Sequence, residues 1–105
     1  MTATRSILRV CSADDVDWNS ARRVETAELV LAVYNVDGQF YVTDDQCTHG
    51  PGSLADGELY GYEIECDFHG GRFDVRTGQV SAPPCIIPIR SYKAWVEASD
   101  VMIEV

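Results

Sequence analysis

The feature that most constrains this chain is a period-2 alternation of apolar and polar residues, dense in β-branched and aromatic side chains. Such alternation is typical of β-strands, whose successive side chains point to opposite faces of a sheet. A single helical turn is expected after Ser12, where Asp14 and Asp15 favour a helix N-terminus, but no 3.6-residue period continues it. The sequence therefore predicts an all-β fold, an antiparallel β-sandwich of small sheets.

Turn residues divide this pattern into strands. Asp37-Gly38 predicts a two-residue hairpin turn, because glycine tolerates a positive φ, and Thr77-Gly78 predicts a second hairpin. The expected strands are 7–10, 29–36, 39–43, 62–66, 72–75, 79–81, 91–97 and 101–105. In the fourth of these, Ile64 and Cys66 share a face with Tyr62, and two glutamates occupy the other face.

Three further expectations concern individual residues. Arg22-Arg23 is interpreted as a solvated loop pair, and Cys11 and Cys85 as buried thiols, because their neighbours are apolar. Aromatic residues are expected in the core or on sheet faces. These are Trp18, Phe40, Tyr41 and Trp95.

Length and charge exclude several classes of protein. A chain of 105 residues has room for one domain, predicted over residues 1–105. Its net charge of -9, with one Lys and seven scattered Arg, argues against nucleic-acid binding. The longest apolar run is residues 29–34, far short of the roughly 20 that span a bilayer, so no membrane segment is expected. No secretory signal is recognised near the N-terminus, and the cytosol is the expected compartment.

The residues that carry chemistry lie in two glycine-rich loops. Two boxes stand in these loops, Cys47-Thr48-His49-Gly50 and Cys66-Asp67-Phe68-His69-Gly70. Sixteen residues lie between His49 and Cys66, and the boxes contain both histidines of the chain. Two thiolates and two imidazoles could hold one tetrahedral zinc ion or a [2Fe–2S] cluster with both Cys on one iron. Small Cys2His2 zinc modules pair their cysteines in one element and their histidines in another. Here each loop supplies one of each, which favours the binuclear cluster.

The two boxes resemble the cluster-binding boxes of the Rieske family. The likeness extends to Asp56-Gly57, 71–74, Thr77-Gly78 and 82–84. With these features the chain resembles the soluble Rieske-type ferredoxins of bacterial aromatic-ring-hydroxylating dioxygenase systems, which are about as long as this chain. The resemblance implies the Rieske fold, with a loop-rich cluster-binding subdomain at about residues 44–84. It also implies one [2Fe–2S] cluster as cofactor. The implied ligands are Cys47, His49, Cys66 and His69.

The same resemblance implies a function in electron transfer. The protein would carry single electrons from an NADH-dependent flavoprotein reductase to the terminal oxygenase of an aromatic-ring-hydroxylating dioxygenase, as a monomer that is not itself an enzyme. If both histidines bind the cluster, none remains for the mononuclear iron of an oxygenase. Two alternatives stay open: a Rieske-like subunit fixed in another oxidoreductase complex, and a structural module held by zinc.

Three further expectations concern the surroundings of the cluster. Respiratory Rieske proteins place Ser and Tyr hydroxyls near the cluster sulfurs, where this chain has Gly71 and Phe73, so a low reduction potential is expected. Residues 44–74 hold eight acids and one base, which predicts docking onto basic sites of redox partners. Pro83 and Pro84 are expected to stiffen a loop that covers the cluster.

Overall fold

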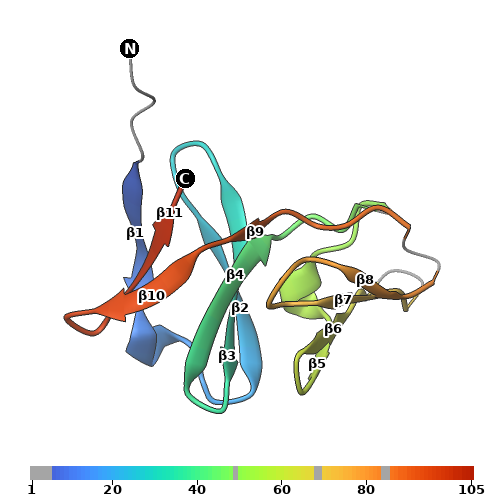
Figure 1. Ribbon diagram of the computed structural model, residues 1–105, viewed down its shortest axis with the longest axis horizontal. Helices are drawn as coiled ribbons and strands as arrows, with labels where there is room; N and C mark the ends of the chain where they lie inside the picture. Colours follow the sequence, from blue (N-terminus) through green and yellow to red (C-terminus); the bar gives the residue numbers. More distant parts are fainter. Residues whose placement is uncertain (1–5, 49, 68–69, 84–85) are drawn as a thin grey trace.

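The computed structural model describes residues 6–48, 50–67, 70–83 and 86–105 (Figure 1). Within these ranges the chain forms three antiparallel sheets and two short 3-10 turns, and no α-helix, so the prediction of an all-β fold is confirmed. No helix in the described part is long and apolar enough to cross a bilayer.

The three sheets each have a simple strand order. The terminal sheet has the order β1 (Ile7–Ser12), β11 (Asp100–Glu104), β10 (Ala94–Glu97). The central sheet has the order β2 (Ser20–Glu25), β3 (Val30–Val36), β4 (Gln39–Asp44), β9 (Ser91–Tyr92). The small sheet has the order β5 (Glu58–Tyr60), β6 (Glu63–Glu65), β7 (Arg72–Asp74), β8 (Val80–Ala82). The 3-10 turns are Ala13–Asp15, which Ser12 caps as predicted, and Leu54–Asp56.

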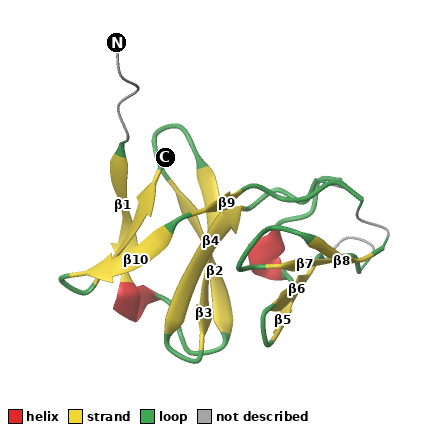
Figure 2. Ribbon diagram, in the orientation of Figure 1, coloured by secondary structure: helices red, strands yellow, loops and turns green. Residues whose placement is uncertain are grey.

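Strand β3 lies between two hydrophobic cores. Its residues Leu31 and Val33 belong to the core shared with the terminal sheet, whereas Tyr34 and Val36 belong to the core shared with the small sheet. All four are at most 2% exposed. Figure 2 shows the central sheet between the other two. Because successive side chains of a strand alternate in direction, one strand supplies both cores.

The β3–β4 hairpin is confirmed, with its turn at the predicted residues. Asp37 has φ 51° and Gly38 has φ 90°, so both central residues are in the left-handed region that a two-residue hairpin turn requires. Trp18 lies over this turn, with its ring 3.3 Å from where a Cβ of Gly38 would be. Trp18 is 69% exposed and lies in a turn outside the strands, so the prediction that it lies in the core or on a sheet face is wrong.

The predicted strand 91–97 is divided in two. Residues Ser91 and Tyr92 pair with β4 in the central sheet, and β10 pairs with β11 in the terminal sheet. The chain changes sheets near Lys93. Period-2 alternation does not show such a change of partner, because the side chains keep alternating through it.

Strands β2 and β5 were not predicted, and the interpretation of Arg22-Arg23 as a loop pair is wrong. Both arginines are exposed residues of β2, which pairs with β3 from Ser20↔Asn35 to Glu25↔Val30. Strand β2 is at the edge of its sheet, where polar and charged side chains are common. The apolar pattern that indicates a strand is therefore weak there.

Gly57 is required by a close backbone approach. A Cβ at this position would lie 1.8 Å from the backbone oxygen of Glu65 on β6, so any larger residue must push β5 and β6 apart. Gly61, in the turn between the same strands, has φ 60° and no atom within 4 Å of where a Cβ would be. A substitution at Gly57 therefore tests the steric effect of an added Cβ, and a substitution at Gly61 tests the cost of the left-handed backbone conformation.

We predict that Gly57→Ala lowers the free energy of unfolding by about 2 kcal/mol or more, because backbone must move. Gly61→Ala, the control, should cost roughly 1 kcal/mol, from its left-handed conformation alone. Urea unfolding followed by circular dichroism measures both. Equal destabilisation by the two substitutions would contradict the steric argument.

Candidate metal centre

The first cysteine loop leaves the end of β4 and returns to the 3-10 turn at Leu54. Its base is a bridge between Gln46 and Ser53. Above this bridge the backbone N–H of Cys47 donates to the carbonyl of Gly52 (2.9 Å). The N–H of Gly50 donates to the carbonyl of Cys47 (3.3 Å). Cys47 is thus fixed through both of its backbone groups.

The second cysteine loop follows β6 and has the same closure. The N–H of Cys66 donates to the carbonyl of Gly71 (2.6 Å), and the N–H of Gly70 donates to the carbonyl of Cys66 (3.2 Å). Gly70 adopts φ 74°, which favours glycine. In both loops the cysteine N–H bonds the carbonyl of the glycine five residues later, although the sequences between differ.

The two cysteine side chains meet in one buried cluster. Cys47 is 2% exposed and Cys66 is 1% exposed, and both pack in the core that contains Ile64 and Phe73. The prediction that β6 delivers Ile64 and Cys66 inward is confirmed. Tyr62, expected on the same face, is 40% exposed, because it lies in the β5–β6 turn.

Among the described residues, each of the two loops supplies one cysteine of the expected centre. His49 and His69 lie outside the described residues, so two of the four expected ligands are seen, and the described part holds no group of three or more His, Cys, Asp or Glu suited to a metal. Thiolate sulfur is the donor that iron–sulfur clusters require. Two buried sulfurs at matching positions of two similar loops supply that half of the donor set.

A third segment, residues 86–89, is tied to the first loop. The Thr48 hydroxyl donates to the carbonyl of Ile87 (2.6 Å), and the N–H of Ile89 donates to the carbonyl of Gly78 (2.9 Å). Ile86 is 84% exposed and Ile87 is 58% exposed. Pro83 is exposed, whereas Pro84 lies outside the described residues, so the expectation of a stiff covering loop stays a prediction.

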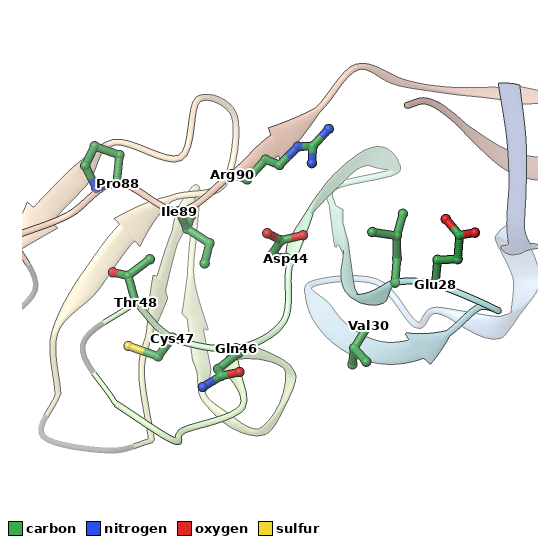
Figure 3. Close-up of a pocket in the computed structure, with 10 residues that line it drawn as sticks. Glu28, Val30, Asp44, Gln46, Cys47, Thr48, Pro88, Ile89 and Arg90 are labelled. Atoms are coloured by element: carbon green, nitrogen blue, oxygen red, sulfur yellow. The ribbon is translucent and has the colours of Figure 1, made fainter. Parts of the chain in front are cut away.

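A groove of about 600 Å³ runs from the first loop towards the start of β3. In the view of Figure 3, Asp44 lies between Thr48 on one side and Glu28 on the other, with Arg90 above it. The Tyr92 hydroxyl donates to Asp44 (2.6 Å), and burial together with this carboxylate raises the pKa of Tyr92 to about 12. Tyr92 is therefore a neutral donor that holds β9 against the end of β4.

Arginine side chains neutralise part of the acidic surface. Arg72 pairs with Glu63 and Glu65 (both 3.4 Å), and its guanidinium lies 4.5 Å from the centre of the Tyr60 ring. Arg76 pairs with Asp74 (2.8 Å), and its hydrogen bond to that carboxylate holds the pKa of Asp74 below its usual value.

The remaining acids of residues 44–74 divide by burial. Asp45 is 3% exposed, so its carboxylate lies inside the protein. The acids that are exposed are Asp56, Glu58 and Asp67. Sequence reasoning did not separate Asp45 from the exposed acids, and the only signal that the sequence offers is an acidic residue two positions before Cys47.

The cysteines outside the two boxes have separate outcomes. Cys11 is 6% exposed in the core beside the terminal sheet, which confirms it as a buried residue, and burial raises the pKa of its thiol. Cys85 lies outside the described residues. Phe40, Tyr41 and Trp95 are partly buried, as residues on sheet faces.

Comparisons with known proteins agree with this centre. Residues 6–93 match the model of the Rieske [2Fe-2S] domain. The ferredoxin component of the p-cumate 2,3-dioxygenase system of Pseudomonas putida is 45% identical over 101 residues, which cover 94% of this chain and 86% of the relative.

Two solved structures have the same fold. The ferredoxin of Sphingomonas yanoikuyae B1 is 44% identical, with a TM-score of 0.90, over 95% of this chain and 99% of the other. A ferredoxin-containing structure of carbazole 1,9a-dioxygenase, a complex of reduced oxygenase and oxidized ferredoxin, has a chain that is 44% identical, with a TM-score of 0.86, over 92% of this chain and 91% of the other. The match across most of the chain, together with the paired cysteine loops, shows that this protein belongs to the Rieske [2Fe-2S] family.

Proposed function

We propose that this protein is a one-electron carrier whose Rieske [2Fe–2S] cluster is held by Cys47, His49, Cys66 and His69. The observation that carries the proposal is the matched closure of two loops, each with a buried cysteine. When bound, the cluster supplies reversible one-electron oxidation and reduction. The protein's own part is to fix the ligands and to bury the sulfur side of the centre. We place these ligands in one Rieske domain, residues 1–105, with a cluster-binding subdomain at about 44–84.

The partners follow from the relatives. A ferredoxin chain 44% identical to this one was solved in a complex with the oxygenase of carbazole 1,9a-dioxygenase. We infer that this chain likewise delivers electrons to the terminal oxygenase of an aromatic-ring-hydroxylating dioxygenase. The donor we propose is an NADH-dependent flavoprotein reductase, with the exchange taking place in the cytoplasm and the carrier acting as a monomer.

A carrier rather than an oxygenase is supported by the ligand count. A mononuclear oxygenase iron is usually held by two His and one carboxylate. The chain has two histidines, and both are assigned to the cluster. We therefore assign the chemical step on the aromatic substrate to the partner.

We predict that Cys47→Ala or Cys66→Ala abolishes the visible absorption and the EPR signal of the reduced cluster, because each removes one thiolate ligand. Both should also destabilise the fold, since ligand binding and folding are coupled. Cys11→Ala is the control, because Cys11 lies in the other core. A normal cluster spectrum in either ligand variant would overturn the assignment, and a colourless wild-type protein containing zinc would favour the structural module.

We predict a reduction potential in the lower part of the roughly -150 to +300 mV Rieske range. Hydrogen bonds to the cluster sulfurs stabilise the reduced state, and neither Gly71 nor Phe73 carries a hydroxyl to donate one. Phe73 is fully buried in the same core as Cys47 and Cys66. A redox titration with a midpoint above about +100 mV would contradict this expectation.

We predict that electron transfer to the terminal oxygenase slows as ionic strength rises, because screening shortens the reach of the exposed acids to about 10 Å at 0.1 M salt. The double variant D56N/E58Q should lower the rate at low salt and flatten its salt dependence. Its control is D14N/D17N, which removes two exposed acids at the 3-10 turn and the residues just after it. Equal effects of the two variants would show that the net charge of the protein steers docking, rather than the particular acids Asp56 and Glu58.

A further inference from the structure

Asp45 is a buried carboxylate at the base of the first cysteine loop. It is 3% exposed, and each of its oxygens accepts a hydrogen bond from the returning limb of that loop. The Ser53 hydroxyl donates to Oδ2 (2.7 Å), and the backbone N–H of Ala55 donates to Oδ1 (3.0 Å). The side chain thus bridges the two ends of the segment that contains Cys47.

The backbone of Asp45 joins the same segment to the central sheet. Its N–H donates to the carbonyl of Val30 on β3 (3.0 Å), and its carbonyl accepts from the N–H of Leu54 (2.8 Å). Arg23 of β2 approaches Oδ2 with its Nε (3.4 Å). A single residue therefore connects β2, the start of β3 and both limbs of the loop.

The charge of Asp45 is held mainly by the loop itself. Arg23 is about half exposed and also pairs with Glu25 at a shorter distance (2.8 Å), so it is a shared and solvated partner. A buried carboxylate is costly unless donors satisfy it. Opening the loop would remove the Ser53 and Ala55 donors while the carboxylate remained at the sheet, so the negative charge stabilises the closed loop.

We propose that Asp45 is a positioning residue for the cluster, which fixes the loop of residues 46–53 and so determines where Cys47 presents its sulfur. This inference rests on the proposed function, since it assumes that Cys47 is a ligand. Asp45 acts through the loop rather than by contact with the iron. Its removal should alter how firmly and in what geometry the cluster is held, while the rest of the sheet remains folded.

The neighbouring residue provides a matched control. Asp44 is also acidic and lies one residue further from Cys47, and the hydrogen bond that its carboxylate accepts comes from the Tyr92 hydroxyl of β9, outside the loop. Asp44→Asn and Asp45→Asn remove the same charge at almost the same place. An effect of charge alone is common to both variants, and an effect of positioning is confined to Asp45→Asn.

The experiment uses the protein loaded with its cluster and measures the rate at which an iron chelator bleaches the visible absorption. We expect Asp45→Asn to raise this rate roughly tenfold or more over Asp44→Asn, the factor that a hydrogen bond to a charged group typically supplies. The EPR spectrum of the reduced Asp45→Asn variant should show broader lines or shifted g values. The spectrum of the Asp44→Asn variant should match that of the wild type. Circular dichroism of each variant monitors the sheets.

A milder variant keeps the test decisive if Asp45→Asn folds poorly. Ser53→Ala removes one donor to the carboxylate and should raise the bleaching rate by a smaller factor. The double variant D45N/S53A should be no faster than D45N, because both changes break the same contact. Additive effects of the two substitutions, or equal bleaching rates and EPR spectra for the Asp44 and Asp45 variants, would overturn the proposal. A wild-type protein without a cluster would instead refute the proposed function.

Discussion

Burial of β3 on both faces is the constraint on which the rest of the structure depends. Leu31, Val33 and Tyr34 are completely buried, and each such side chain contributes roughly 1.5–3 kcal/mol by leaving water. The Tyr34 hydroxyl, the one polar group among them, is paired with Thr43 of β4 (2.8 Å). One strand of a small chain thus contributes to two cores. The small sheet, whose strand β6 leads directly to Cys66, is attached to the central sheet through the second core.

That attachment explains how short strands hold a precise site. Strands β5 to β8 have three residues each and would be marginal in isolation. Packing against Tyr34 and Val36 gives them a fixed platform, and the close contact of Gly57 with the Glu65 carbonyl sets the distance between β5 and β6 immediately before Cys66. The cysteine loops then add backbone closure, so the position of each cysteine is determined by the sheets first and by the loops second.

The sequence indicated the residues of the proposed site more clearly than the boundaries of the strands and sheets. The Cys and His boxes, and the turn at Asp37-Gly38, are local signals, because metal ligation and a positive φ demand particular residue types. The edge strand β2 and the change of sheet near Lys93 are set by tertiary neighbours, which leave the alternation of side chains unaltered. The exposed Trp18 shows the same limit: its place over Gly38 depends on a turn that is distant in the sequence.

The summed charge of a segment does not show which of its acidic residues are exposed, paired or buried. Residues 44–74 have a summed charge of -7, yet Arg72 and Arg76 pair with three of the eight acids and Asp45 faces the interior. Arg72 also lies over Tyr60, so its charge serves the small sheet rather than a partner. Exposed acids such as Asp56 and Glu58 remain available for the docking that we propose, whereas Asp45, also acidic, is bound to the loop that carries Cys47. Burial and donors, which the sequence does not display, decide whether an acid serves recognition or architecture.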